Sequence, residues 1–140
     1  MILRASIVAG SALLALGMTT PAHADPCKGR LPTQPGIQFS GAVRYVGDGD
    51  SLCVGKTNDP NGWIEVRLAD FDAPEVHRPG GTAAKAALER IALHREVSCT
   101  AERGRSGRVV SFDRVIARCK IRSVSVGDLL RAAGVPEDGN

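Results

Sequence analysis

Long apolar stretches are scarce in this chain of 140 residues, and their scarcity excludes most membrane architectures. One run alone is strongly apolar, at residues 7–18, and it follows a short start that carries Arg4. The small residues of the Ala-His-Ala sequence at 22–24 then match a signal peptidase site. The run is too short for a transmembrane helix, so we predict a secretory signal peptide at residues 1–24, with a retained membrane anchor as the alternative. No later segment approaches membrane length, and we therefore expect no stable membrane insertion.

Aromatic residues are also few, at 4% of the chain. A surface that binds nucleic acid by stacking successive bases on aromatic rings is correspondingly weak. Charge of one sign is not in large excess either, because the formal net charge is only +3. This mild basicity does not establish nucleic-acid binding, since an ordinary solvated surface shows the same balance. The length suits one domain rather than two, and the sequence contains no internal repeat and no low-complexity tract.

Alternating hydrophobicity predicts a three-stranded meander after an irregular, Pro- and Gly-rich lead-in at residues 25–36. In the first strand the apolar residues share one parity, and Gly41 interrupts them, which predicts a bulge or bend there; these residues are Ile37, Phe39, Val43 and Tyr45. The sequence VGDGDS predicts a tight turn, and a short strand follows at residues 51–54. After the turn sequence KTNDPNG, the alternating WIEVRL predicts the third strand.

The period then changes to that of a helix, with Thr82 as the expected cap of a helix at residues 82–94. EVSCT and VIARCKI predict two further strands, and a short second helix at residues 126–133 is expected to stop at Gly134 and Pro136. This order predicts an α+β fold, mainly β, at residues 37–140. The predicted fold is a five-stranded OB-fold Greek-key barrel, with a helix between strands three and four and a short C-terminal helix. Another small α+β sandwich is the alternative.

The four cysteines show no C-x-x-C spacing, which argues against the alternative of a zinc site with four thiolate ligands. An even number of cysteines in an exported chain favours disulfides, with three possible pairings. We predict that Cys99 pairs with Cys119, because the strands that carry them are neighbours in the expected barrel. Cys27 then pairs with Cys53 and fixes the lead-in to the second strand. The alternative for Cys119 is a buried free thiol within its strand.

Charged residues gather where the predicted strands begin and end. Two aspartates lie in the first turn, two carboxylates follow the third strand, and arginines lie at the end of the third strand and the start of the fifth; they are Asp48, Asp50, Asp72, Glu75, Arg67 and Arg114. In a meander these positions can meet at one end of the barrel. Converging carboxylates repel one another unless a cation compensates them, and Ca²⁺ prefers such oxygen ligands. Arginine beside a cation suits a phosphodiester, and a carboxylate that does not bind the metal can deprotonate water.

Each of these signals is ordinary when taken alone. The sequence DGD is common turn chemistry, and DAPE also suits the first turn of a helix. Arg67 and Arg114 could equally be surface residues or partners in structural ion pairs. Their combination at these positions carries the hypothesis of a catalytic site.

Four sequences, VGDGDSLCV, VRLADFDAPEVHRPGGTAAKAALERI, FDRVIARC and VGDLLRAAG, resemble successive motifs of the thermonuclease (staphylococcal nuclease) family. The resemblance covers residues 41–134, nearly the whole of the predicted mature chain. It implies a calcium-dependent nuclease that hydrolyses phosphodiester bonds of DNA and/or RNA, in single-stranded or unpaired regions. It also implies a secreted or periplasmic protein, which we expect to be a monomer.

The resemblance also implies roles for individual residues. Asp50, Asp72 and the backbone carbonyl of Ala73 match the calcium ligands, and Asp48 matches an acidic position close to the metal. Glu75 matches the residue that positions or deprotonates the attacking water. The two remaining positions are arginines: Arg67 matches the one that binds the phosphate and stabilises its transition state, and Arg114 matches the one that acts at the scissile phosphate and leaving group. Arg108 is a rival for this last role, but Arg114 is preferred because FDRVIARC runs directly into a strand.

The chain departs from the family pattern in ways that leave other functions open. Phe112 stands where tyrosine is common and lacks the hydroxyl that could reach a phosphate, and the sequence after Gly134 lacks the long C-terminal helix of the best-known members. One alternative is a catalytically weak or inactive OB-fold module that binds nucleic acid or another ligand in the cell envelope. Another is a small structural or envelope-associated protein. The presence of every carboxylate and arginine of the motifs favours the enzyme.

Overall fold

The computed structural model describes residue 17 and residues 25–138, so the predicted signal peptide lies almost entirely outside the described residues. Five strands form the body of the fold: β1 (Gln38–Asp48), β2 (Ser51–Gly55), β3 (Ile64–Leu68), β4 (Glu96–Ala101) and β6 (Arg114–Ile121). Two short strands accompany them, β5 (Val110–Ser111) and β7 (Val124–Ser125), neither of which the sequence pattern predicted. The helices are α1 (Gly81–Ala92), α2 (Val126–Ala132) and one 3₁₀ turn, η1 (Pro60–Gly62).

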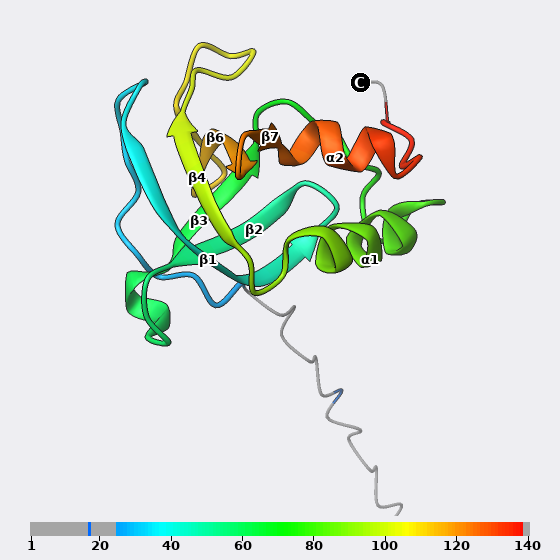
Figure 1. Cartoon of the computed structure of the whole chain (residues 1–140), viewed down its shortest axis with the longest axis horizontal. Helices are drawn as coiled ribbons and strands as arrows, with labels where there is room; N and C mark the ends of the chain where they lie inside the picture. Colours follow the sequence, from blue (N-terminus) through cyan, green and yellow to red (C-terminus); the bar gives the residue numbers. More distant parts are fainter. Residues whose placement is uncertain (1–16, 18–24, 139–140) are drawn as a thin grey trace, which may run out of the picture.

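The five long strands close into a barrel (Figure 1). β1, β2 and β3 form the predicted antiparallel meander. β4 pairs antiparallel with both β1 and β6, and the parallel pairing of β3 with β6 closes the cylinder. With α1 between β3 and β4 and the short α2 near the end, the predicted OB-type α+β fold is confirmed.

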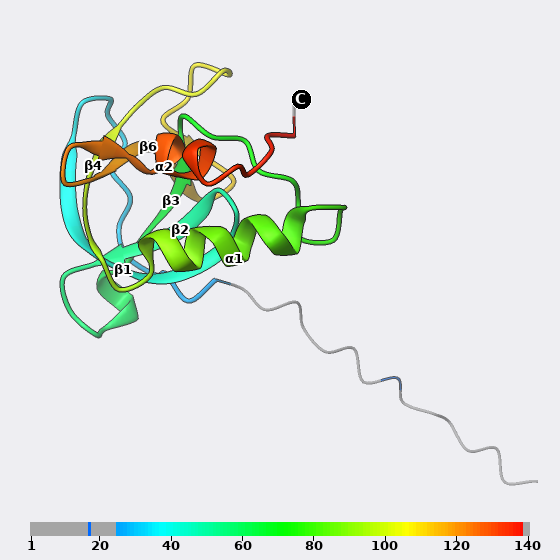
Figure 2. The same cartoon turned by 45° about the vertical axis from the view of Figure 1, so that its right-hand side comes forward.

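The barrel is filled by alternate residues of its strands. The buried side chains are small and mostly β-branched, which suits a narrow interior; they include Val43, Leu52, Val66, Val97 and Val115. The two helices lie on one side of the barrel, where Leu88 of α1 and Leu130 of α2 are fully buried (Figures 1 and 2). Burial of one such leucine stabilises the fold by about 1.5–3 kcal/mol.

The sequence predicted a bulge or bend at Gly41, and the bulges of β1 lie elsewhere. The register between β1 and β2 shifts between Val43 and Tyr45 and again after Val46, not at Gly41. At the first shift, the Arg44 guanidinium donates across the hairpin to the Gly55 carbonyl at 3.0 Å. The extra residue at the shift changes which alternate side chains of β1 point inward. Val43 and Val46 therefore both face the core, although they are three residues apart.

Thr82 is not the cap of α1. The helix begins one residue earlier, at Gly81, and its N-cap is Gly80 in the left-handed conformation, with no side-chain cap. The Thr82 hydroxyl donates instead to the Val76 carbonyl at 3.4 Å. Gly81 is required here because any Cβ would overlap the carbonyl oxygen of Glu75.

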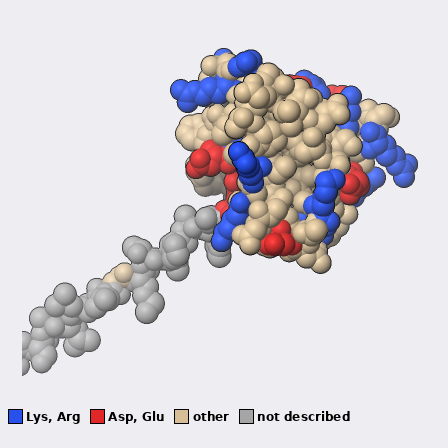
Figure 3. Space-filling model, turned by 90° about the vertical axis from the view of Figure 1, so that its left-hand side faces the viewer, with Lys and Arg blue, Asp and Glu red and all other residues tan. Residues whose placement is uncertain are grey.

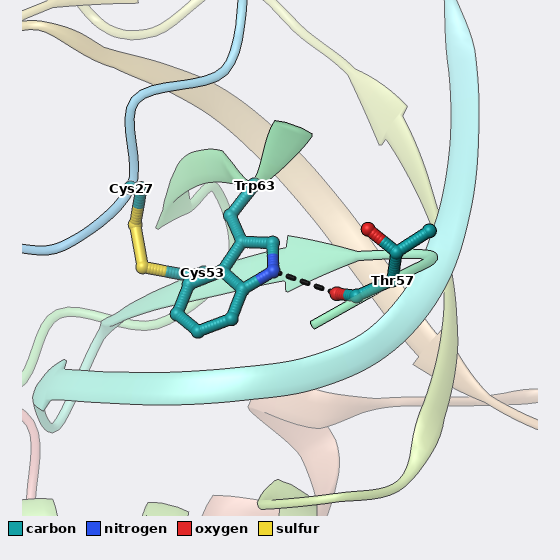
Figure 4. The surroundings of a disulfide bond; sticks show 4 residues. All are labelled: Cys27, Cys53, Thr57 and Trp63. Carbon is teal, nitrogen blue, oxygen red and sulfur yellow. Dashed lines mark hydrogen bonds between the residues drawn. A yellow bond between two sulfur atoms is a disulfide. The ribbon is translucent and has the colours of Figure 1, made fainter. Parts of the chain in front are cut away.

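Both predicted disulfides are present. Cys99 and Cys119 are direct cross-strand partners on β4 and β6, and Cys27 is bonded to Cys53 on β2. The Trp63 ring lies beside the second disulfide and donates its Nε1–H to the Thr57 carbonyl at 2.8 Å (Figure 4). The lead-in is therefore tied to the barrel. None of the helices in the described part of the chain has the length and apolar character needed to cross a membrane.

Candidate active site

The first turn of the barrel packs directly against the segment that follows β3. The Asp50 carbonyl accepts a hydrogen bond from the Leu68 N–H at 2.8 Å, and its carboxylate accepts one from the Ala73 N–H at 2.8 Å. Gly49 permits this approach, because a Cβ there would lie 2.6 Å from the Ala73 side chain. The turn and the DFDAPE segment thus meet, as the meander predicted.

Arg67 lies between two of the predicted metal-binding carboxylates. Its Nη2 is 3.3 Å from Asp50 Oδ2 and is also hydrogen-bonded to Asp72 Oδ1. Its Nη1 donates to the carbonyls of Leu68, at 2.6 Å, and Phe71, at 2.7 Å. Four acceptors therefore fix the guanidinium, although 23% of the side chain remains exposed to solvent. A fixed and partly open guanidinium is suited to a further anion.

Asp48 and Asp50 form an electrostatically strained pair. Asp50 is 6% exposed, and burial together with the negative charge of Asp48 raises its pKa to about 7, although Arg67 opposes the rise. Burial also acts to raise the pKa of Asp48, but hydrogen bonds from Asp50 and Ser51 outweigh it and hold that pKa below its ordinary value. The two carboxyl groups therefore favour sharing a proton. An added cation would relieve the same strain.

A cleft of about 510 Å³ opens beside Arg67. Arg114, at the start of β6, lines this cleft together with Arg67, whereas Arg108 is not among the lining residues. Arg105 also lines it and lies 3.7 Å from Asp72 Oδ2. The sequence analysis missed Arg105, although the Arg-rich loop that contains it was visible. The cleft is therefore bordered by several cations and includes Asp72, one of the two carboxylates bound to Arg67.

Glu75 does not join this cluster. Its side chain is exposed, and it forms no hydrogen bond or ion pair with the other described residues. Its backbone carbonyl accepts from the Arg78 N–H at 2.9 Å, in the turn that leads to α1. The structure thus brings together Asp48, Asp50, Arg67 and Asp72, and it leaves the predicted base at the edge of the group.

A second carboxylate pair escaped the sequence analysis. Asp25 and Glu65 share a hydrogen bond, and burial together with Asp25 raises the pKa of Glu65 to about 7, while the Arg114 charge opposes the rise. Burial and the same Asp25 also raise the pKa of Tyr45. Glu65 could have been found, because it lies two residues before Arg67 on β3 and therefore on the same face of the strand.

The donor chemistry of the site suits a hard cation. Asp50 and Asp72 face one another across Arg67, and carboxylate oxygens are the ligands that Ca²⁺ prefers. Within residues 25–138 no group of three or more His, Cys, Asp or Glu side chains is arranged to hold a metal. A calcium ion would therefore need further oxygens, from the Ala73 carbonyl and from water, to reach its usual six to eight.

The basic side chains on one face of the molecule do not form a continuous patch. On the face seen in Figure 3, Lys and Arg side chains stand apart, separated by uncharged and acidic surface. The arginines that line the cleft, by contrast, come together from β3, β6, α2 and the loop before β5. The convergence of arginines from four separate parts of the chain marks the cleft as the candidate anion site.

Comparison of the chain with models of known protein families and with curated proteins finds no match. The likeness to thermonuclease motifs is thus carried by the quoted residues alone. A function for the chain has to be inferred from the arrangement of Arg67 between Asp50 and Asp72 and from the cleft beside it.

Proposed function

We propose that the protein is a secreted, calcium-dependent nuclease of the thermonuclease type, which hydrolyses phosphodiester bonds of DNA and/or RNA. The observation that carries the proposal is the Arg67 guanidinium, fixed between Asp50 and Asp72 at the edge of a cleft that Arg114 also lines. This arrangement offers oxygen ligands for a hard cation beside donors for a phosphate. Those are the two requirements of phosphodiester hydrolysis assisted by a metal.

In this proposal Asp50, Asp72 and the Ala73 carbonyl would hold a calcium ion, which would supply positive charge beside the phosphate. Arg67 donates hydrogen bonds to non-bridging oxygens, and its fixed position means that little reorganisation is needed as the reaction proceeds. Arg114 binds the phosphate from the other side of the cleft. Glu75 accepts the proton of the attacking water, a role that its exposed position permits once substrate covers the site.

The rim of the cleft supports a substrate with unpaired bases. Phe112 lines the cleft and is 88% exposed, at the tip of the hairpin between β5 and β6. Its φ of 50° is a left-handed conformation that is unfavourable for a bulky residue. An exposed aromatic ring held in this way can stack on a base that is not paired, and stacking contributes about 1–3 kcal/mol per base.

The two disulfides support the proposed location. Structural disulfides form and persist in oxidising compartments, such as the periplasm or the extracellular space. The predicted signal peptide at residues 1–24 leads to the same compartments. Export would also keep a nuclease away from the nucleic acids of its own cytoplasm.

One observation favours a second candidate, an OB-fold module that binds nucleic acid without cleaving it. The Glu75 carboxylate is not hydrogen-bonded to the cluster that it would serve as a base. A protein of this kind would retain oligonucleotide in the cleft, with or without calcium, and would release it intact.

The decisive experiment uses the purified protein from Asp25 onward. Labelled single-stranded DNA and RNA are incubated with it in calcium and, separately, in a chelator. Cleavage in calcium that stops in the chelator supports the nuclease, whereas binding without cleavage in both conditions selects the second candidate. Neither binding nor cleavage would refute both.

Variants then assign the residues. Arg67→Ala and Glu75→Gln are each expected to lower kcat by about 10²–10³, because each removes a group that acts in the transition state. Arg95→Ala and Glu96→Gln are the matched controls, since both residues are exposed and lie outside the cleft. Full activity of a folded Glu75→Gln variant would refute the assigned base.

A further inference from the structure

The C-terminal segment makes unexpected contacts with the site. After α2 the chain turns back, and its end lies beside the segment that leads from β3 to α1 (Figures 1 and 2). The Asp138 N–H donates to the Asp72 carbonyl at 2.9 Å, and the Asp72 N–H donates to Glu137 Oε1 at 3.4 Å. Both backbone polar groups of Asp72 are therefore engaged by two consecutive residues of the C-terminal segment.

Arg131 fixes this segment to α2. Its guanidinium donates to both carboxylate oxygens of Glu137, at 3.0 and 3.3 Å. The same group is hydrogen-bonded to the Asp70 carbonyl and lies over the Phe71 ring, 5.5 Å from its centroid. Arg131 and Glu137 together thus contact three successive residues, of which Asp72 is the last. A fork of this kind holds its partners in one geometry better than a single contact could.

The contacted residue is central to the proposed site. The Asp72 carboxylate is bonded to Arg67, and it is one of the two carboxylates assigned to calcium. A displacement of its backbone would move a metal ligand and the partner of a phosphate-binding arginine together. Removal of a group that orients a metal ligand without touching the metal commonly lowers the affinity of the site for the metal by about 10–100-fold.

We propose that Arg131, Glu137 and the Asp138 N–H form a C-terminal clamp that positions Asp72 for calcium. The inference rests on the proposed function, because it concerns the calcium site of that nuclease. The clamp residues are positioning residues. They do not bind the metal and act on it through the backbone of Asp72, although Arg131 and Glu137 also line the cleft.

The test measures calcium affinity of the purified protein by isothermal titration calorimetry, together with the melting temperature in a chelator. Glu137→Ala and Arg131→Ala are each expected to raise the calcium Kd about tenfold. Glu137→Gln should raise the Kd less than Glu137→Ala, because its amide oxygen still accepts from the Asp72 N–H and from Arg131 Nη2, whereas its amide nitrogen cannot accept from Arg131 Nε. The variant Asp128→Asn is the control, since this exposed residue also pairs with Arg131 but does not contact Asp72.

Two further comparisons separate positioning from simple stability. Asp138→Pro removes the N–H that binds the Asp72 carbonyl and should raise the Kd, while Asp138→Ala keeps the N–H and should not. In a double-mutant cycle, the variant that combines Arg131→Ala with Glu137→Ala should bind calcium no more weakly than Arg131→Ala alone. Both changes release the same contact with Asp72, so their effects on the Kd should not add. At saturating calcium the kcat of Asp138→Pro should return to within about twofold of the wild-type value, because Asp138 does not line the cleft and its N–H acts only through Asp72.

The outcomes are distinct. If the wild type binds no calcium, the proposed function fails and the clamp fails with it. If the wild type binds calcium and the Ala variants bind it equally well, only the clamp is overturned. Two other results would also overturn the clamp: additive effects of Arg131→Ala and Glu137→Ala on the calcium Kd, or calcium binding by Glu137→Gln as weak as that by Glu137→Ala. Either result would indicate that the charges act on calcium at a distance and do not position the backbone of Asp72.

Discussion

Asp50→Asn tests the electrostatics of the site without reference to any function. In the folded protein burial and Asp48 raise the pKa of Asp50 from 3.8 to about 7. Between these values the folded state binds more protons than the unfolded chain, so the free energy of unfolding falls as pH rises. The stability that the protonated group contributes is complete below about pH 4 and is lost as pH rises through about 7. Asparagine keeps an acceptor for the Ala73 N–H and removes the titration.

The magnitude follows from the size of the shift. One pKa unit corresponds to about 1.4 kcal/mol, so the full window represents on the order of 4 kcal/mol. Asp48 titrates together with Asp50 and shares its proton, so we expect on the order of 2 kcal/mol of differential stability between about pH 5 and about pH 7.5. Relative to the wild type, Asp50→Asn should become more stable by this amount at the higher pH.

The assay is urea unfolding of both proteins in a chelator at the two pH values. Asp128→Asn removes an exposed carboxylate outside the pair and should leave the pH dependence unchanged. Parallel pH profiles for the wild type and Asp50→Asn would refute the strained pair. Calcium should reverse the ranking if the proposed function is right, because a ligand bound by the native state stabilises it, and the variant has lost one of its ligands.

Two stability predictions concern the frame around the site. Gly81→Ala should destabilise the protein by about 1–3 kcal/mol, because the new Cβ overlaps the Glu75 carbonyl, whereas Gly62→Ala, which meets no atom within 4 Å, should change it by less than about 0.5 kcal/mol. Equal effects in thermal unfolding would contradict this account of the turn. Replacing Cys99 and Cys119 together by alanine opens a covalent link across 20 residues and should cost about 3 kcal/mol in urea unfolding. A double variant as stable as the wild type would show that the bond contributes no stability.

The local pattern predicted much of the barrel because strands and turns are encoded over a few residues. Alternation located the meander, and the expected neighbourhood of two strands was enough to pair Cys99 with Cys119. The parity of β1 could not be obtained in this way. It follows from the register shifts in the pairing of β1 with β2, between Val43 and Tyr45 and after Val46. A contact between residues far apart in sequence leaves no periodic signal.

In the candidate site, too, the residues close to the turns of the meander could be predicted, and those that depend on distant contacts could not. Asp48, Asp50 and Asp72 could be placed together because each lies beside an end of a strand of the meander; Asp50 and Asp72 contact Arg67, and Asp48 accepts from the Asp50 N–H. Glu137 could not be assigned to the site from the sequence, because a glutamate in a short segment after a helix is usually an ordinary solvated charge. Its importance appears only when Arg131 and Asp72 are seen on either side of it.

The parallel pairing of β3 with β6 determines when the cleft can exist. Val66 and Leu68 pair with Val115 and Ala117, residues that the chain reaches only after α1 and β4. Such a non-local pairing requires a long loop to close first, and contacts of this kind form slowly. Arg67 and Arg114 share no cleft until that closure is complete. A chain that emerges N-terminus first would therefore keep Arg114 apart from Arg67 until most of its length had emerged, even though Asp50, Arg67 and Asp72 can already meet within the meander.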